Sequence, residues 1–153
     1  MKITFKNIDE VVIDDVLAGR YSDLRSQLKG KPYSISKELL EEVAARKDSE
    51  LLLFLYVDGE VAGMAQASFI CVPQSESGYI NAVVVDDAHR GHGLGTTLVE
   101  EIHARSQQRW PNLKHFVLTS APARGTQGFY TRLGYRMRTK EAGDETTFFI
   151  KDL

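Results

Sequence analysis

With 153 residues, 42% of them hydrophobic, and a formal net charge of −2 at pH 7, the chain has the size and composition of one domain, residues 1–153, around a single core. The near balance of charge gives no general attraction to nucleic acid or to an acidic membrane surface, so we expect neither as a partner. No apolar run approaches the roughly 20 residues that span a bilayer, and four acidic residues interrupt the first twenty positions, so we expect a cytoplasmic protein rather than a membrane-bound or secreted one.

The first half of the chain predicts a strand, two helices and a hairpin. Residues 2–5 alternate between apolar and polar side chains, as in a half-buried strand. A first helix stops before Gly30, and its apolar positions are Ile13, Leu17, Leu24 and Leu28. Ser36 can cap a second helix to about Lys47, with an expected buried side of Leu39, Leu40, Val43 and Ala44. Two strands, 51–57 and 61–72, follow around Asp58-Gly59, a strong hairpin pattern.

The second half predicts a loop over 73–78, a buried strand over 80–85 and an amphipathic helix from about Gly93 to Gln107. Beyond them we expect a strand over 115–119, a short helix over 124–133, and a hairpin of 135–139 and 146–150 around a turn at 141–144. An antiparallel meander followed by β-α-β crossovers predicts a mixed-sheet protein of the α+β class.

The sole cysteine, Cys71, excludes an internal disulfide and a metal site with several cysteine ligands. Its apolar neighbours favour a buried structural thiol over a nucleophile. We expect no metal.

A turn of seven residues, Asp86 to His92, joins the strand at 80–85 to the following helix. Gly91, Gly93 and Gly95 lack the Cβ atoms that would keep a ligand away from the backbone, and the first turn of the helix offers unpaired N–H groups. These amides, the positive end of the helix dipole and the guanidinium of Arg90 favour an anion, and a phosphorylated ligand in particular. The alternative is an ordinary strand-to-helix turn.

The turn does not match two common phosphate-binding patterns. A Walker loop needs Gly-Lys-Ser/Thr, which the chain lacks, and a dinucleotide-binding turn needs glycine at position 96, where the chain has threonine. The pattern Arg-x-x-Gly-x-Gly, formed by Arg90, Gly93 and Gly95, resembles the acyl-CoA pyrophosphate loop of the GNAT superfamily of N-acetyltransferases. Phe129-Tyr130-x-x-Leu133-Gly134-Tyr135 is similar to a second motif of that superfamily.

The resemblance implies a GNAT-like fold, with a mostly antiparallel twisted sheet of about seven strands flanked by four helices. It implies an enzyme that transfers an acetyl group from acetyl-CoA to a primary amine by direct attack in a ternary complex. Tyr130 would give a proton to the departing thiolate, because a phenol and a thiol have similar pKa values. Tyr130 could instead be an interior aromatic residue. The expected cofactor-binding residues are Val83, Val84, Val85, Arg90, Gly91, His92, Gly93, Leu94, Gly95 and Thr96, with the side chain of His92 facing solvent.

The residue that removes the proton from the amine is less clearly indicated. Some members of the superfamily have an acid or a histidine at the positions that match Tyr79 and Asn81, neither of which is a base near neutral pH. Asn81 could hold a water, and Glu76, followed by Asp86, is the nearest carboxylate. Both carboxylates could equally be solvated surface charges, and a site that binds the neutral amine needs no dedicated base.

The acceptor is expected to be a small-molecule amine. The resemblance implies that its groove is walled by residues 21–36 and by the final hairpin. Tyr21, Asp23 and Tyr33 could form an aromatic and acidic pocket there, and Tyr79 is a further candidate contact. A solvated loop face is the alternative for the first three residues. The sequence also leaves open a peptide or protein acceptor, a non-catalytic acyl-CoA-binding module, and a homodimer.

Overall fold

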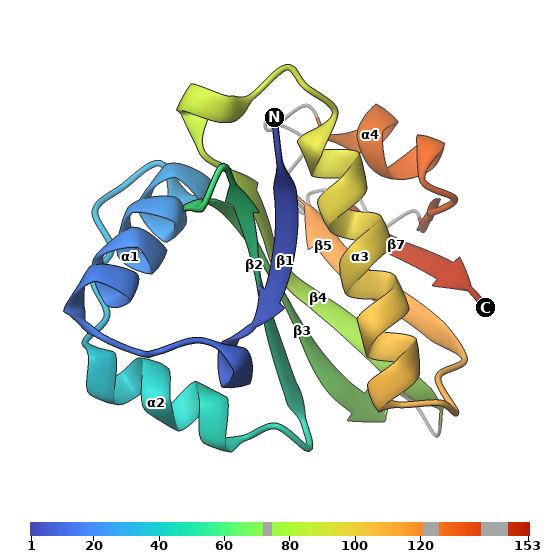
Figure 1. Cartoon of the computed structure of the whole chain (residues 1–153). Helices are drawn as coiled ribbons and strands as arrows, with labels where there is room; N and C mark the ends of the chain where they lie inside the picture. Colours follow the sequence, from blue (N-terminus) through green and yellow to red (C-terminus); the bar gives the residue numbers. More distant parts are fainter. Residues whose placement is uncertain (72–74, 121–125, 139–146) are drawn as a thin grey trace.

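The computed structural model describes residues 1–71, 75–120, 126–138 and 147–153, which form a sheet covered by helices on both faces (Figure 1). Within these residues, the sheet has seven strands in the order β1-β2-β3-β4-β5-β7-β6. The strands are β1 (Ile3–Asn7), β2 (Glu50–Val57), β3 (Glu60–Cys71), β4 (Glu76–Val85), β5 (His115–Ser120), β6 (Arg136–Arg138) and β7 (Thr147–Asp152). The parallel pair is β4 with β5, and the other neighbouring strands are antiparallel.

The four α-helices of the described residues lie on opposite faces of this sheet. They are α1 (Asp15–Lys29), α2 (Lys37–Ala45), α3 (Leu94–Arg109) and α4 (Gln127–Arg132), with short 3₁₀ turns at Ile8–Glu10 and Asp87–His89. Helices α1 and α2 cover one face and α3 the other (Figure 1). The predicted α+β class, strand number and helix number are therefore confirmed.

Local chemistry sets the ends of the elements much as the sequence predicts. The carboxylate of Asp14 accepts a hydrogen bond of 2.8 Å from the amide of Leu17 and caps α1, which ends at Gly30 in the left-handed region. The Ser36 hydroxyl accepts from the amide of Leu39 at 3.2 Å and caps α2. Asp58 and Gly59 both have positive φ, as the two-residue turn between β2 and β3 requires.

Three local predictions are wrong. Cys71 is exposed, because it is the last residue of β3 and lies at the margin of the sheet. Leu39 is 49% exposed, since α2 turns its neighbour Leu40 fully into the core instead. Glu76 is the first residue of β4 rather than part of a loop.

Other predicted segments lie outside the described residues: part of the loop at 73–78, the first residues of the helix at 124–133, and the turn at 141–144. Within the described residues, no helix is long and apolar enough to cross a membrane. Nor do three or more His, Cys, Asp or Glu side chains gather there in a way that could hold a metal ion.

The two faces of the sheet have separate hydrophobic clusters because the side chains of each strand alternate between them. Leu51, Leu53 and Leu55 of β2 lie under α3 with Phe116 and Phe149. Leu52 and Phe54 lie on the other face, under α1 and α2, with Leu24 and Leu40. The sheet is therefore buried on both sides.

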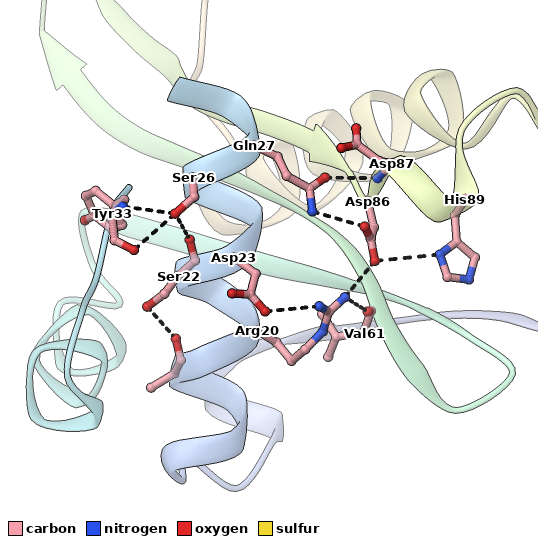
Figure 2. A network of polar contacts seen from close by, with 11 residues as sticks. Arg20, Ser22, Asp23, Ser26, Gln27, Tyr33, Val61, Asp86, Asp87 and His89 are labelled. Carbon is pink, nitrogen blue, oxygen red and sulfur yellow. Dashed lines mark hydrogen bonds and ion pairs between the residues drawn. The ribbon is translucent and has the colours of Figure 1, made fainter. Parts of the chain in front are cut away.

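A polar network ties α1 to the end of β4 (Figure 2). Arg20 donates to Asp86 Oδ2 at 2.9 Å and to the carbonyl of Val61 at 2.9 Å, while Gln27 donates to Asp86 Oδ1 at 3.1 Å. The amide of Asp87 in turn donates to Gln27 Oε1 at 2.9 Å. Partial burial raises the pKa of Asp86, but the hydrogen bonds from Gln27 and Arg20 outweigh it and hold that pKa below its usual value.

We expect Asp86→Ala to lower the free energy of unfolding by about 2 kcal/mol, because it leaves Arg20 and Gln27 without their shared acceptor. Asp23→Ala is the matched control, since Asp23 pairs with the same arginine at 3.4 Å but its side chain is 64% exposed; its loss should stay below about 0.5 kcal/mol. Urea unfolding measures both. The stabilisation by Asp86 should be complete above the ordinary carboxyl pKa and disappear as the pH falls through the lowered one. Equal losses in the two variants would contradict this account.

A buried histidine of α3, His103, contacts a buried tyrosine, Tyr135. His103 Nε2 and the Tyr135 hydroxyl are 2.7 Å apart, and the imidazole stacks on Phe116 with ring centroids 4.3 Å apart. Burial, helped by the charge of Lys151, lowers the pKa of His103 to about 4, and burial raises the pKa of Tyr135. His103 is therefore neutral at pH 7.

Because the pKa of His103 is lower in the folded protein than in the unfolded chain, its stabilising contribution is present above about pH 6.5 and falls as the pH drops towards 4. Between pH 7 and pH 5 we expect the parent protein to lose about 2 kcal/mol more of unfolding free energy than His103→Gln. The glutamine keeps a partner for Tyr135 but does not titrate. Urea unfolding at the two pH values tests this, and parallel losses would refute it.

Candidate active site

A cleft opens where β4 and β5 separate. The two strands pair through Ser77–Tyr79 and His115–Val117, and no pairing continues beyond Tyr79 among the described residues. The cleft has a volume of about 680 Å³ and is lined by Ile80–Val85 of β4 and Leu118–Ser120 of β5, with residues of α1, α3 and α4. The edge of β4 that faces β5 therefore presents backbone groups to the cleft rather than to a neighbouring strand.

The glycine-rich turn lies at the end of this cleft. Gly91 and Gly93 have φ values of +89° and +70°, a region that disfavours a side chain, and Gly93 is the N-cap of α3. Arg90 lines the cleft and is held by the Val85 carbonyl at 3.2 Å and by Asp87 at 3.0 Å. His92 is exposed, in agreement with the orientation predicted for it. The turn thus places helix-start amides and an arginine beside one another.

Asn81 is the extra residue of a β-bulge in β4. Two positions of β3, Gln66 and Ala67, pair with Ala82 and Ile80, so Asn81 has no partner of its own. A bulge changes the direction of its side chain, and here Asn81 lines the cleft. Its Nδ2 donates to Ser68 Oγ at 2.6 Å. The amide oxygen Oδ1 of Asn81 therefore points away from Ser68.

A hydrogen-bonded chain continues from Asn81 to a carboxylate that the sequence analysis missed. Ser68 donates to Glu50 Oε2 at 2.8 Å, so Asn81, Ser68 and Glu50 form one chain across three strands. Strand register alone brings Glu50 opposite Ser68, and Ser68 opposite Tyr79. A one-residue bulge cannot be placed from the sequence pattern, which is why this chain was not foreseen.

Tyr130 lies on α4 and also lines the cleft. Its ring packs edge-on against Tyr135 and tilted against Phe149, with centroids 5.7 Å away in each case, and its carbonyl accepts from the Tyr135 amide at 3.1 Å. The half-buried ring is thus fixed by the cluster beneath α3. Of the predicted catalytic residues, the structure brings Tyr130 and Asn81 to the same cleft.

The structure does not bring Glu76 to that cleft. Glu76 begins β4, five residues before Asn81, which corresponds to about 16 Å along a strand. Tyr79 is closer to the cleft than Glu76 is. Its hydroxyl is 3.1 Å from the hydroxyl of Thr119, a cleft residue on the neighbouring strand β5. No Asp, Glu or His lines the cleft among the residues that the structure describes.

Residues 21–33 do not form the expected aromatic and acidic pocket. Tyr21 is 2% exposed and bonds Gln66 Oε1 through its hydroxyl at 3.0 Å, while Asp23 points to Arg20. Tyr33 contacts Tyr21 edge-on, with centroids 6.5 Å apart. Arg25, which the sequence analysis overlooked, lies beside both rings and lines the cleft.

Comparison with solved structures shows that this architecture is shared. The chain is similar to the GNAT domain of S. lividans PAT (TM-score 0.75, 20% identity, covering 97% of this chain and 89% of that one). It is also similar to the PaiA N-acetyltransferase of Thermoplasma acidophilum in complex with coenzyme A (0.74, 15%, 100% of each chain). A third similar structure is glucosamine-6-phosphate N-acetyltransferase of Arabidopsis thaliana (0.74, 19%, 94% of this chain and 98% of that one).

No curated protein is detectably similar in sequence. The model of the acetyltransferase (GNAT) family, however, matches residues 19–135. This range contains both the glycine-rich turn and Tyr130, and it spans most of the 153 residues. The chain therefore belongs to the GNAT family of acetyltransferases.

Proposed function

We propose that the protein is an N-acetyltransferase that transfers the acetyl group of acetyl-CoA to a primary amine of a small molecule, by direct attack in a ternary complex. The observation that carries this proposal is a single cleft that runs from the glycine-rich turn to Tyr130 along an unpaired strand edge. A structurally similar protein, PaiA, is in complex with coenzyme A, which supports the same class of ligand here.

The cofactor side of the cleft has the groups that an acyl-CoA needs. The amides at the start of α3, from His92 to Thr96, together with Arg90, would hold the pyrophosphate. Backbone groups of Val83, Val84 and Val85 would bind the amides of pantetheine as a neighbouring strand would. Gly95 lines the cleft without a side chain and leaves room beside the turn.

Tyr130 and Asn81 would serve the chemical step. The amine nitrogen forms a bond to the acetyl carbon, the carbon–sulfur bond breaks, and Tyr130 gives a proton to the departing sulfur. The nitrogen loses its extra proton to water as the amide forms, and water returns a proton to the Tyr130 phenolate. Asn81 Oδ1 would accept a hydrogen bond from the attacking amine, because Nδ2 is already engaged with Ser68. The lack of an acidic or histidine side chain among the described residues of the cleft favours a site that binds the amine in its neutral form.

The same lack of a base is compatible with a second candidate function, a non-catalytic acyl-CoA-binding module. Both candidates require the cofactor, and they differ in whether amines release coenzyme A from it. An assay of thiol release with a panel of amines distinguishes them. Peptide amines belong in the same panel, because a peptide acceptor is the alternative to a small molecule.

We expect the parent protein to bind acetyl-CoA with micromolar affinity in calorimetric titration, and Gly95→Ala to bind it at least about tenfold more weakly. The added Cβ would meet Phe129 at 3.6 Å, an ordinary contact, so the variant should fold normally while its methyl group occupies the cleft. Gly19→Ala is the matched control, since this helical glycine has no atom within 4 Å of an added Cβ and does not line the cleft. Failure of the parent protein to bind acetyl-CoA would reject both candidate functions.

We expect Tyr130→Phe to lower kcat by about 10²-fold or more and to leave acetyl-CoA affinity unchanged, because it removes the proton donor but keeps the ring. Tyr56→Phe, which removes a hydroxyl outside the cleft, is the control and should retain the parent kcat. Thiol release under saturating amine measures both variants. A Tyr130→Phe enzyme with the parent rate would show that Tyr130 has only a packing role.

A further inference from the structure

The side of the cleft that α1 forms is positively charged. Arg25 and Lys29, one helical turn apart on α1, both line the cleft, whereas no acidic residue does so in the described part of the chain. On the basis of the proposed function, we propose that Arg25 binds a carboxylate or phosphate group of the acceptor. The substrate would then be a small primary amine that also carries an acidic group.

Two tyrosine rings hold the guanidinium of Arg25 in place. Its central carbon lies 5.8 Å from the ring centroid of Tyr21 and 5.5 Å from that of Tyr33, and Lys29 Nζ lies 5.6 Å from the Tyr33 ring. The backbone of Tyr33 is itself held by Ser26, whose hydroxyl accepts from the Tyr33 amide at 2.9 Å (Figure 2). Arg25 also hydrogen-bonds the side chain of Tyr21, but contacts with ring faces use no N–H group, so its remaining N–H donors stay available for an anion.

Arg25 also has no counter-ion among the residues that the structure describes. In the described residues, no carboxylate lies within ion-pairing distance of it, and its Nε is buried without an acceptor. Arg20, on the same helix, pairs with Asp86 at 2.9 Å, and Arg105 pairs with Glu101 at 2.8 Å. A half-buried guanidinium without an acid costs free energy, and an anion in the cleft would supply the missing partner.

The position of Arg25 points to the acceptor rather than to the cofactor. Arg25 lies over Tyr21, which belongs to the cluster beneath α1 and α2, whereas Tyr130 packs against the cluster beneath α3. The two residues therefore approach the cleft from opposite faces of the sheet. If Tyr130 meets the sulfur of the cofactor, a ligand entering from the other face meets Arg25.

Nuclear magnetic resonance tests this binding without turnover. The ¹⁵N-labelled protein is saturated with coenzyme A, and the Nε–H resonance of Arg25, identified by its loss in Arg25→Lys, is followed during titration. The probes are N-acetyl-β-alanine and inorganic phosphate, with N-ethylacetamide as the neutral control. We expect a saturable shift with at least one acidic probe and none with the neutral one. The absence of a shift with both acidic probes would overturn the inference.

Kinetics with matched amines give a second, independent test. The pairs are O-phosphoethanolamine with ethanolamine and β-alanine with propylamine, and we expect at least a tenfold higher kcat/KM for the acidic member of at least one pair. Arg25→Gln should abolish this preference and change acetyl-CoA affinity less than twofold. Arg46→Gln removes the same charge from the C-cap of α2, outside the cleft, and should keep the preference.

The outcomes separate this inference from the proposed function. If the protein binds coenzyme A but no acidic probe shifts Arg25, the acidic-substrate inference fails and the transferase proposal stands. If Arg25→Gln weakens acetyl-CoA binding more than tenfold and the preference persists, Arg25 belongs to the cofactor site and the inference is wrong. If the parent protein binds no coenzyme A, the proposed function itself fails.

Discussion

The separation of β4 from β5 is the feature on which the rest of the site depends. Two parallel strands that pair over three residues and then diverge leave one edge of β4 without ladder hydrogen bonds. Such groups are costly to bury unpaired, so the space beside them must be open to water or to a ligand with its own amides. Tyr130 from α4 and the amides at the start of α3 border that space. The absence of β4–β5 pairing beyond Tyr79 in the described residues thus creates both the cleft and its hydrogen-bonding edge.

Helix α1 connects the two ends of the site. On one side, Arg20 and Gln27 hold Asp86 and Asp87, the first residues of the glycine-rich turn. On the other side, the hydroxyls of Ser22 and Ser26 hold the chain after the helix; Ser22 accepts from the amide of Ile35 at 3.0 Å. Figure 2 shows the contacts of Arg20, Gln27 and Ser26 arising from one helix. The turn and the segment that contains Tyr33 are therefore positioned relative to each other by one rigid element.

The two arginines that line the cleft, Arg90 and Arg25, differ in how their charges are compensated. Arg90 is already paired with Asp87, so its charge is partly compensated before any phosphate arrives. Arg25 is held by aromatic rings instead, and the carboxylate of Glu50 is engaged by Ser68. The amide of Asn81 also lines the cleft and takes its orientation from Ser68. Orientation of the acceptor would thus depend on hydrogen bonds and on a cation rather than on a carboxylate.

The sequence by itself determined the order of the elements, the glycine-rich turn and the aromatic motif, because helix caps, the Asp58-Gly59 turn, the positive φ of Gly93 and side-chain periodicity are local properties. Those patterns were sufficient for the fold and for placing the glycine-rich turn and Tyr130 beside one cleft. Only the tertiary structure decided the surroundings of Asn81 and Arg25, because they depend on strand register and on the packing of α1. A bulge at Asn81 aligns it with Ser68 and Glu50, and the packing of α1 puts Arg25 beside Tyr33. A one-residue shift in either would exchange these side chains for others, and no local pattern records which arrangement is realised.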